Sequence, residues 1–172
     1  MTRARLVLAA AIATALWPSV AAAQRAVFVV RHAEKASEGS EKEIPLSAAG
    51  QQRAARLAQL LRSAGVTAVY ATDTVRARET GAPLAREANV AVKLYETRDA
   101  KGNMTAEPLV ARLKADEKDG VVLVVGHSNT VPDVIAAYGA KELVRIGPDD
   151  YGDLFLVVPQ PSGLPVVLRL KF

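Results

Sequence analysis

Residues 121–125 read Val-Val-Leu-Val-Val, and Gly120 and Gly126 stand on either side of them. A short run of β-branched and aliphatic residues without alternation is typical of a strand that is buried on both faces of a sheet. Strands of this kind occur in α/β proteins, where helices cover both faces of a largely parallel sheet. The segment 121–125 therefore indicates a central strand of an α/β fold.

The rest of the chain alternates between strand and helix patterns. Short apolar runs predict strands at residues 26–30, 66–71, 90–95, 153–158 and 166–170, and periodic apolar spacing predicts helices at 47–65, 74–89, 105–118 and 130–139. Ser47 and Thr105 are suitable N-caps for two of these helices. The last two strands flank the Pro-containing segment 159–165 and suggest an antiparallel hairpin. We therefore expect an α/β three-layer sandwich, with a mostly parallel central sheet flanked by helices and an antiparallel C-terminal hairpin at one edge.

The composition excludes several classes of protein. Half of the 172 residues are hydrophobic, which excludes an intrinsically disordered chain, and the length suits one domain with a sizeable core. The chain has no Cys, so it has no thiolate nucleophile, iron–sulfur ligand or zinc finger. The net charge of +4 is small and scattered along the sequence, so we expect no nucleic-acid partner.

The first 23 residues have the layout of a secretory signal peptide. Arg3 and Arg5 precede an apolar run at residues 6–16, and Ala21-Ala22-Ala23 provides a small-residue cleavage site. An uncleaved membrane anchor is the alternative, but the run is shorter than the roughly 20 apolar residues that span a bilayer. We expect residues 1–23 to be removed and residues 24–172 to form one exported domain, periplasmic or secreted, without stable membrane insertion.

Both histidines of the chain, His32 and His127, come directly after predicted strands. Arg31 precedes His32, Arg76 follows the strand at 66–71, and Glu96 follows the strand at 90–95. In open α/β sheets, ligands bind beyond the carboxyl ends of the strands. We therefore expect these five side chains to meet at one edge of the sheet.

Two histidines, arginines and a carboxylate suit phosphoryl transfer. The planar guanidinium group matches phosphate oxygens, and a neutral imidazole can form a covalent intermediate. A second, protonated histidine would add positive charge at the phosphate, and a carboxylic acid would protonate the leaving oxygen. This chemistry requires no metal and no cofactor, so we expect neither.

Three motifs resemble those of the histidine phosphatase superfamily, also called phosphoglycerate-mutase-like. They occur in the family's order, and the resemblance covers residues 26–172. Arg31-His32-Ala33-Glu34 resembles its Arg-His-Gly motif, Thr72…Arg76-Ala77…Thr80 resembles its second arginine motif, and Gly126-His127-Ser128 resembles its late Gly-His motif.

The resemblance implies a role for each matching residue. His32 would be the phosphorylated nucleophile, and Arg31, Arg76 and His127 would form the rest of the phosphate pocket. Ala33 stands where the family usually has Gly, and we expect its methyl group to be accommodated. A Glu after the third strand acts as general acid in the mutase-like branch, and Glu96 occupies that place, with Glu34 and Asp99 as the other candidates.

The short chain leaves no room for the large insertions that cover the pocket in phosphoglycerate mutases. Only residues 36–45 and 98–105 offer lid material, so the pocket should be open, as in the small phosphohistidine phosphatases. We expect a metal-independent phosphomonoester hydrolase acting on a phosphorylated small molecule, phospho-sugar or phosphoprotein, as a monomer or weak dimer. A non-catalytic phosphate-binding module and phosphoglycerate-mutase-type transfer remain alternatives.

Other enzyme classes fit the sequence poorly. An α/β-hydrolase requires a His after its nucleophilic Ser, and no His follows Ser128. A zinc deaminase requires a pair of Cys, which the chain lacks. A metal site built from both histidines would lie beside arginines that repel a cation.

Overall fold

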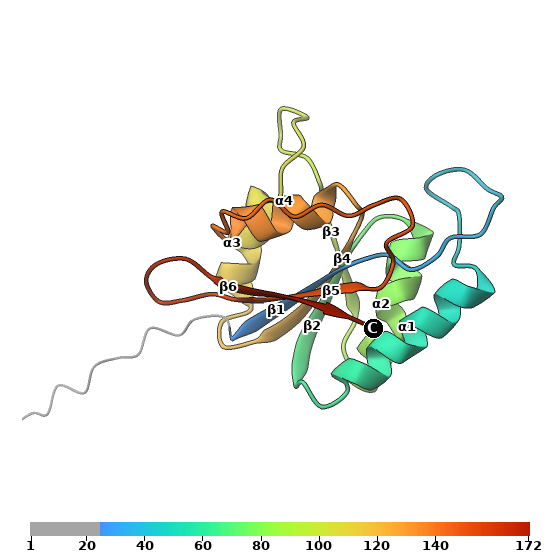
Figure 1. Ribbon diagram of the computed structural model, residues 1–172, viewed down its shortest axis with the longest axis horizontal. Coiled ribbons are helices and arrows are strands. Elements are labelled where there is room, and N and C mark those ends of the chain that lie inside the picture. Colours follow the sequence, from blue (N-terminus) through green and yellow to red (C-terminus); the bar gives the residue numbers. More distant parts are fainter. Residues whose placement is uncertain (1–24) are drawn as a thin grey trace, which may run out of the picture.

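The computed structural model describes residues 25–172 (Figure 1), so the predicted signal peptide at residues 1–23 lies outside the described residues. In this range the chain forms six strands and four helices. They are β1 (Ala26–Arg31), α1 (Ala48–Leu61), β2 (Val66–Thr72), α2 (Val75–Glu87), β3 (Val92–Tyr95), α3 (Glu107–Asp116), β4 (Val121–Gly126), α4 (Thr130–Ala137), β5 (Asp153–Val158) and β6 (Val166–Lys171).

The six strands form one sheet in the order β3-β2-β4-β1-β5-β6. The pairs β3–β2, β2–β4 and β4–β1 are parallel, and the pairs β1–β5 and β5–β6 are antiparallel. Strand β4 lies between two parallel neighbours, and all its residues are buried. The predicted central strand and the antiparallel hairpin at one edge are both confirmed.

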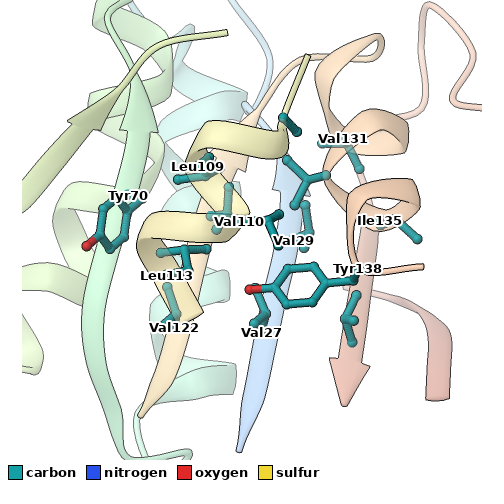
Figure 2. Close-up of a cluster of buried hydrophobic side chains, with 14 of the residues drawn as sticks. Val27, Val29, Tyr70, Leu109, Val110, Leu113, Val122, Val131, Ile135 and Tyr138 are labelled. Atoms are coloured by element: carbon teal, nitrogen blue, oxygen red, sulfur yellow. The ribbon is translucent and has the colours of Figure 1, made fainter. Parts of the chain in front are cut away.

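Helices cover both faces of the sheet, which confirms the three-layer sandwich. Helices α1 and α2 pack on one face, and α3 and α4 on the other (Figure 1). Figure 2 shows the second face, where Leu109 and Leu113 of α3 and Ile135 of α4 belong to one cluster of buried side chains with Val27 and Val29 of β1. Burying such side chains stabilises the fold by about 1.5–3 kcal/mol each.

One helix cap agrees with the sequence and one does not. The Ser47 hydroxyl accepts a hydrogen bond from the Gly50 N–H at 3.1 Å, so Ser47 is the N-cap of α1, as predicted. Thr105 is not the N-cap of α3, because that position belongs to Ala106. The Thr105 hydroxyl still accepts from the Glu107 N–H at 3.2 Å, so the pattern identified the right turn and missed the cap by one residue.

The glycine at position 50 allows the first turn of α1 to pack closely on the chain segment that follows β1. A Cβ at Gly50 would lie 2.1 Å from the backbone oxygen of Glu34, a distance that no side chain allows. The first turn of α1 therefore packs directly on the backbone that follows β1.

Among residues 25–172, none of the four helices has both the length and the apolar content to cross a bilayer.

Candidate active site

The two histidines lie side by side because β1 and β4 are parallel neighbours in register. Arg31 pairs with Gly126 at the carboxyl ends of these strands, and His32 and His127 follow them directly. The His32 N–H donates to the Gly126 carbonyl oxygen at 2.8 Å. The two imidazole rings are 5.1 Å apart between centroids, at an interplanar angle of 67°.

A cavity of about 590 Å³ opens over the two histidines. Four of the five predicted side chains line it, namely Arg31, His32, Arg76 and His127, and Glu96 does not. The remaining wall comes from polar and charged residues of three loops: Lys35, Glu41, Lys42, Asp73, Thr74, Ser128 and Asn129. The strand ends thus meet as predicted, and they form a pocket rich in positive charge.

The contacts of His32 fix its protonation. Its Nδ1 lies 2.8 Å from the Ala33 carbonyl oxygen, which can only accept, so Nδ1 carries the hydrogen. The Arg76 Nε–H donates to its Nε2 at 3.2 Å, so Nε2 presents a lone pair. Burial, together with the nearby His127, Arg76 and Arg31, lowers the pKa of His32 to about 4. At neutral pH His32 is an uncharged imidazole.

His127 differs from the expectation that it is protonated. Its Nε2 lies 2.8 Å from the Thr72 hydroxyl, and its backbone N–H donates to the Thr130 hydroxyl at 2.8 Å. Burial, together with the charges of Arg76 and Arg31, lowers its pKa to about 4. His127 is therefore neutral at pH 7 in the ligand-free pocket, because partial burial and two fixed cations both disfavour a third positive charge.

Arg76 is buried, and each of its three guanidinium nitrogens donates a hydrogen bond. Its Nη1 donates to the Glu41 backbone oxygen, and its Nη2 lies 3.1 Å from the Glu41 carboxylate. Lys35 holds the same carboxylate at 3.0 Å. Glu41 lies in the loop at residues 36–45, which has no periodic pattern, so the sequence analysis missed this contact. The carboxylate of Glu41 is thus hydrogen-bonded to the guanidinium group that we expect to bind phosphate.

Arg31 is held by a loop that the sequence did not single out. Its Nη1 donates to the backbone oxygens of Gly147 at 2.9 Å and Pro148 at 2.7 Å, and its guanidinium group lies 4.1 Å from the centre of the Tyr151 ring. The Nε of Arg31 is buried without a hydrogen-bond partner. Because an unpaired buried donor is destabilising by about 1–3 kcal/mol, this N–H is suited to an acceptor on a ligand.

The structure separates the three candidates for the general acid. Glu34 pairs with Arg53 at 2.6 Å, and that hydrogen bond lowers the pKa of its carboxyl group. Asp99 accepts hydrogen bonds from Asn103 and Lys101 in its own loop, which also lower its pKa. Neither residue lines the histidine cavity. Glu34 and Asp99 are therefore engaged in other contacts away from the histidine cavity, and the identity of the general acid stays a prediction.

Glu96 lines a second cavity, of about 400 Å³. That cavity shares part of its wall with the first one, including His127, Asp73 and Asn129. Glu96 is exposed, and within residues 25–172 no hydrogen bond or ion pair holds its carboxylate. Glu96 thus lies beside the histidine cavity and not in its wall, and its carboxylate is available to contact a ligand.

In the part of the chain that the structure describes, no group of three or more His, Cys, Asp or Glu side chains is arranged to hold a metal ion.

Ala33 stands where the resembling family usually has Gly. The Ala33 methyl group is buried with Leu46 and Ala54, and the Ala33 backbone N–H donates to the Thr80 hydroxyl at 3.0 Å. Ala33 does not line the cavity, so the fold accommodates the methyl group as expected.

Comparison with known proteins supports this picture. The model of the histidine phosphatase superfamily (branch 1) matches residues 27–98, which contain the first two motifs. The structure of the protein histidine phosphatase SixA complexed with tungstate has a TM-score of 0.68 at 20% identity, over 85% of this chain and 96% of that chain.

A second similar structure is that of the mycobacterial glucosyl-3-phosphoglycerate phosphatase with inorganic phosphate. Its TM-score is 0.60 at 17% identity, over 86% of this chain and 96% of that chain. At these identities the structural likeness establishes the fold. Together with the matched motifs at residues 27–98, it confirms that this chain resembles the histidine phosphatase superfamily.

Proposed function

We propose that this protein is a phosphatase that hydrolyses phosphomonoesters through a phosphohistidine at His32. The observation that carries the proposal is the state of His32, a neutral imidazole whose Nε2 carries a lone pair, held by the Arg76 Nε–H at 3.2 Å, in a cavity that Arg31 also lines. A neutral imidazole is a competent nucleophile, and fixed guanidinium groups stabilise the charge of a transferring phosphoryl group. The family-model match and the phosphatases among the similar structures support the same reaction class.

In the first step, the lone pair of His32 Nε2 attacks phosphorus and the bond to the leaving oxygen breaks. Arg31 supplies its unpaired Nε–H to a phosphoryl oxygen, and Arg76 releases Nε2 of His32 and the carboxylate of Glu41 and turns its donors to the phosphate. Glu96, a carboxylate before the reaction, relays a proton from solvent to the leaving oxygen as the bond breaks, and the alcohol departs. The pair of negative charges on the phosphate raises the pKa of His127, so a proton on this ring becomes favourable once substrate is bound.

In the second step, water attacks the phosphohistidine. Glu96, now a carboxylate, takes a proton from this water, and the N–P bond breaks so that its electrons return to Nε2. Inorganic phosphate leaves, and His32 is again a neutral imidazole. The arginines provide the positive charge for both steps, so the reaction as proposed needs no metal ion.

The decisive experiment is hydrolysis of p-nitrophenyl phosphate in EDTA by the wild-type protein and by His32→Ala. We expect turnover by the wild type and none by the variant. A covalent phosphate trapped on His32 of the wild type should survive at alkaline pH and be lost in acid, because the N–P bond of a phosphohistidine is acid-labile. Near wild-type turnover by His32→Ala would remove His32 as nucleophile. Loss of wild-type turnover in EDTA, restored by a divalent metal, would contradict the metal-free route.

The role of Glu96 has its own test. Glu96→Gln should slow esters with poor leaving groups most, because those alone depend on proton donation, and should change p-nitrophenyl phosphate least. Glu87→Gln is the matched control, since Glu87 is an exposed glutamate on α2 outside both cavities. An equal loss for all leaving groups would contradict a general acid.

A non-catalytic phosphate-binding module is the second candidate, favoured by the ion pair that already occupies Arg76. A binding module would show a phosphate-dependent rise in melting temperature and no product release. Mutase-type transfer would move the phosphate to an added alcohol, so product analysis in the presence of an acceptor separates it from hydrolysis.

We also propose that the domain is exported, on the sequence of residues 1–23 alone. Expression of the full chain in a bacterium with two membranes, followed by fractionation and N-terminal sequencing, tests this. A mature protein in the periplasm that begins near Gln24 is expected. An uncut chain in the cytoplasm would contradict it.

A further inference from the structure

The second cavity adjoins the histidine cavity, and His127 belongs to the wall of both. Five residues line both cavities: Lys42, Asp73, Thr74, His127 and Asn129. If the phosphate lies over His32, as the proposed function requires, the group esterified to it has this second space of about 400 Å³ available. The inference below rests on that proposed function.

The two cavities differ in charge. In the first, Lys35 pairs with Glu41 and Lys42 pairs with Asp73, so Arg31 and Arg76 provide an excess of positive charge. In the second, Arg31 and Arg76 are absent from the wall. Asp73, which lines both cavities, is paired with Lys42 and also with Arg78, so Glu96 is the remaining charged residue of this wall, and its carboxylate gives the second cavity a negative charge that a ligand would meet.

The rest of the second cavity is polar and neutral. Burial raises the pKa of the Tyr95 phenol, so this side chain is uncharged. In the described part of the chain, no hydrogen bond occupies the Thr97 hydroxyl or the side-chain amide of Asn129, and Met104 adds an apolar surface. Hydroxyl, amide and carboxylate groups can receive donors from a ligand, and none of them neutralises an anion.

We propose that the second cavity binds the leaving group of the substrate and selects it by charge. It accepts a hydroxylated alcohol that is neutral or carries an ammonium group, and it disfavours an alcohol with a second anionic group. The phosphate occupies the positive cavity, the hydroxyl or ammonium donors meet Glu96, Thr97 and Asn129, and a second carboxylate or phosphate would face Glu96. The substrate class is therefore a sugar-like or amino-alcohol phosphomonoester.

Three esters of similar size test the proposal: glucosamine 6-phosphate, glucose 6-phosphate and 6-phosphogluconate. All release a primary alcohol, and the charge of the remainder is positive, neutral or negative when the buffer keeps the amine protonated. We expect kcat/KM to fall in that order, with about two- to fivefold between successive esters, the size of an interaction with one exposed charge. The differences should shrink as salt is raised, because salt screens exposed charges.

Glu96→Gln separates charge selection from acid catalysis. A loss of kcat common to all three esters reports the acid, whereas the ratios among the esters report the selection, and we expect the ratios to approach one in this variant. Glu87→Gln is the control and should keep the wild-type ratios. Wild-type preference for 6-phosphogluconate, or ratios that Glu96→Gln leaves unchanged, would overturn the inference.

The failure of the proposed function is distinguishable from the failure of this inference. Absence of p-nitrophenyl phosphate turnover by the wild type refutes the phosphatase and says nothing about the second cavity. Calorimetric binding of the same three esters to wild type and Glu96→Gln then decides the charge preference without turnover. The same order of affinities supports the inference, and equal affinities overturn it.

Discussion

The guanidinium Nε of Arg76 donates a hydrogen bond to Nε2 of His32 at 3.2 Å, while Nδ1 of the same ring donates to the Ala33 carbonyl oxygen at 2.8 Å. These two contacts lock both the tautomer and the orientation of the imidazole ring. Arg76 therefore has two roles: it orients the ring in the free protein, and it provides charge for the phosphoryl group once its Nε–H has released Nε2.

Replacing Arg76 should lower the catalytic activity strongly, even when the new residue carries the same charge. Arg76→Ala should lower kcat/KM for p-nitrophenyl phosphate by about 10²-fold or more, the loss seen when one preorganised donor is removed from an active site. Arg76→Lys should recover only a small part, because an ammonium group cannot make the planar, forked contacts of a guanidinium group. Recovery to near wild type by lysine would mean that charge alone matters, and Arg78→Lys, on the same helix outside the cavity, is the control.

Tyr151 should act through Arg31. Its ring lies under the Arg31 guanidinium group at 4.1 Å. Tyr151→Leu should raise KM for phosphomonoesters several-fold with a smaller change in kcat, because Arg31 would lose the aromatic surface that orients it. Tyr151→Phe keeps the ring and should behave like the wild type. Steady-state kinetics of both variants checks this, and equal effects of Leu and Phe would assign the role to the hydroxyl group instead.

Glu41 should compete with phosphate for Arg76. Its carboxylate lies 3.1 Å from Nη2 of Arg76, a donor that the proposed mechanism assigns to the phosphate. Glu41→Gln should tighten the binding of inorganic phosphate about two- to fivefold, since an exposed ion pair no longer has to be broken. Glu38→Gln, in the same loop and outside the cavity, should change nothing. Weaker phosphate binding by Glu41→Gln, measured by calorimetry, would show that Glu41 organises the pocket rather than occupying it.

Acid should destabilise the fold through the two histidines. Both have a pKa of about 4 in the folded protein against 6.5 in an unfolded chain. Between these values the unfolded chain binds protons that the folded one does not, so the free energy of unfolding should fall as pH drops from about 6.5 towards 4 and stay level above that range. Urea unfolding at a series of pH values measures this.

His127→Gln gives the control for the pH series. It removes one of the two titrating rings, so the decline in the free energy of unfolding between pH 6.5 and 5 should be about half as steep as in the wild type. The carboxylates of the fold titrate mainly below this window, because their ordinary pKa values are near 4 and several are lowered by ion pairs. An unchanged slope in the variant would mean that His127 is protonated in the folded protein.

The sequence was sufficient to predict the strands and to identify the edge of the sheet at which the candidate site lies. The run at residues 121–125 has only aliphatic side chains, and a strand of that kind is stable only where both faces are covered, so β4 had to be central. Since parallel strands share one carboxyl end, His32, His127 and Arg76 could be brought together from local patterns alone. The three motifs then pointed to phosphoryl transfer.

Tertiary structure alone decided the partners and states of these residues. Arg31 contacts Gly147 and Pro148 more than a hundred positions away, and Arg76 meets Glu41 through a loop with no periodicity, so no local pattern encodes either contact. The sequence predicts a protonated His127 at the transferring phosphate, and only the structure shows that burial beside two fixed cations keeps the ring neutral in the ligand-free pocket. The residue types determined which chemistry is available to this site. The protonation state of each histidine ring was decided by its burial and by the charges around it, because these depend on groups that only folding brings together.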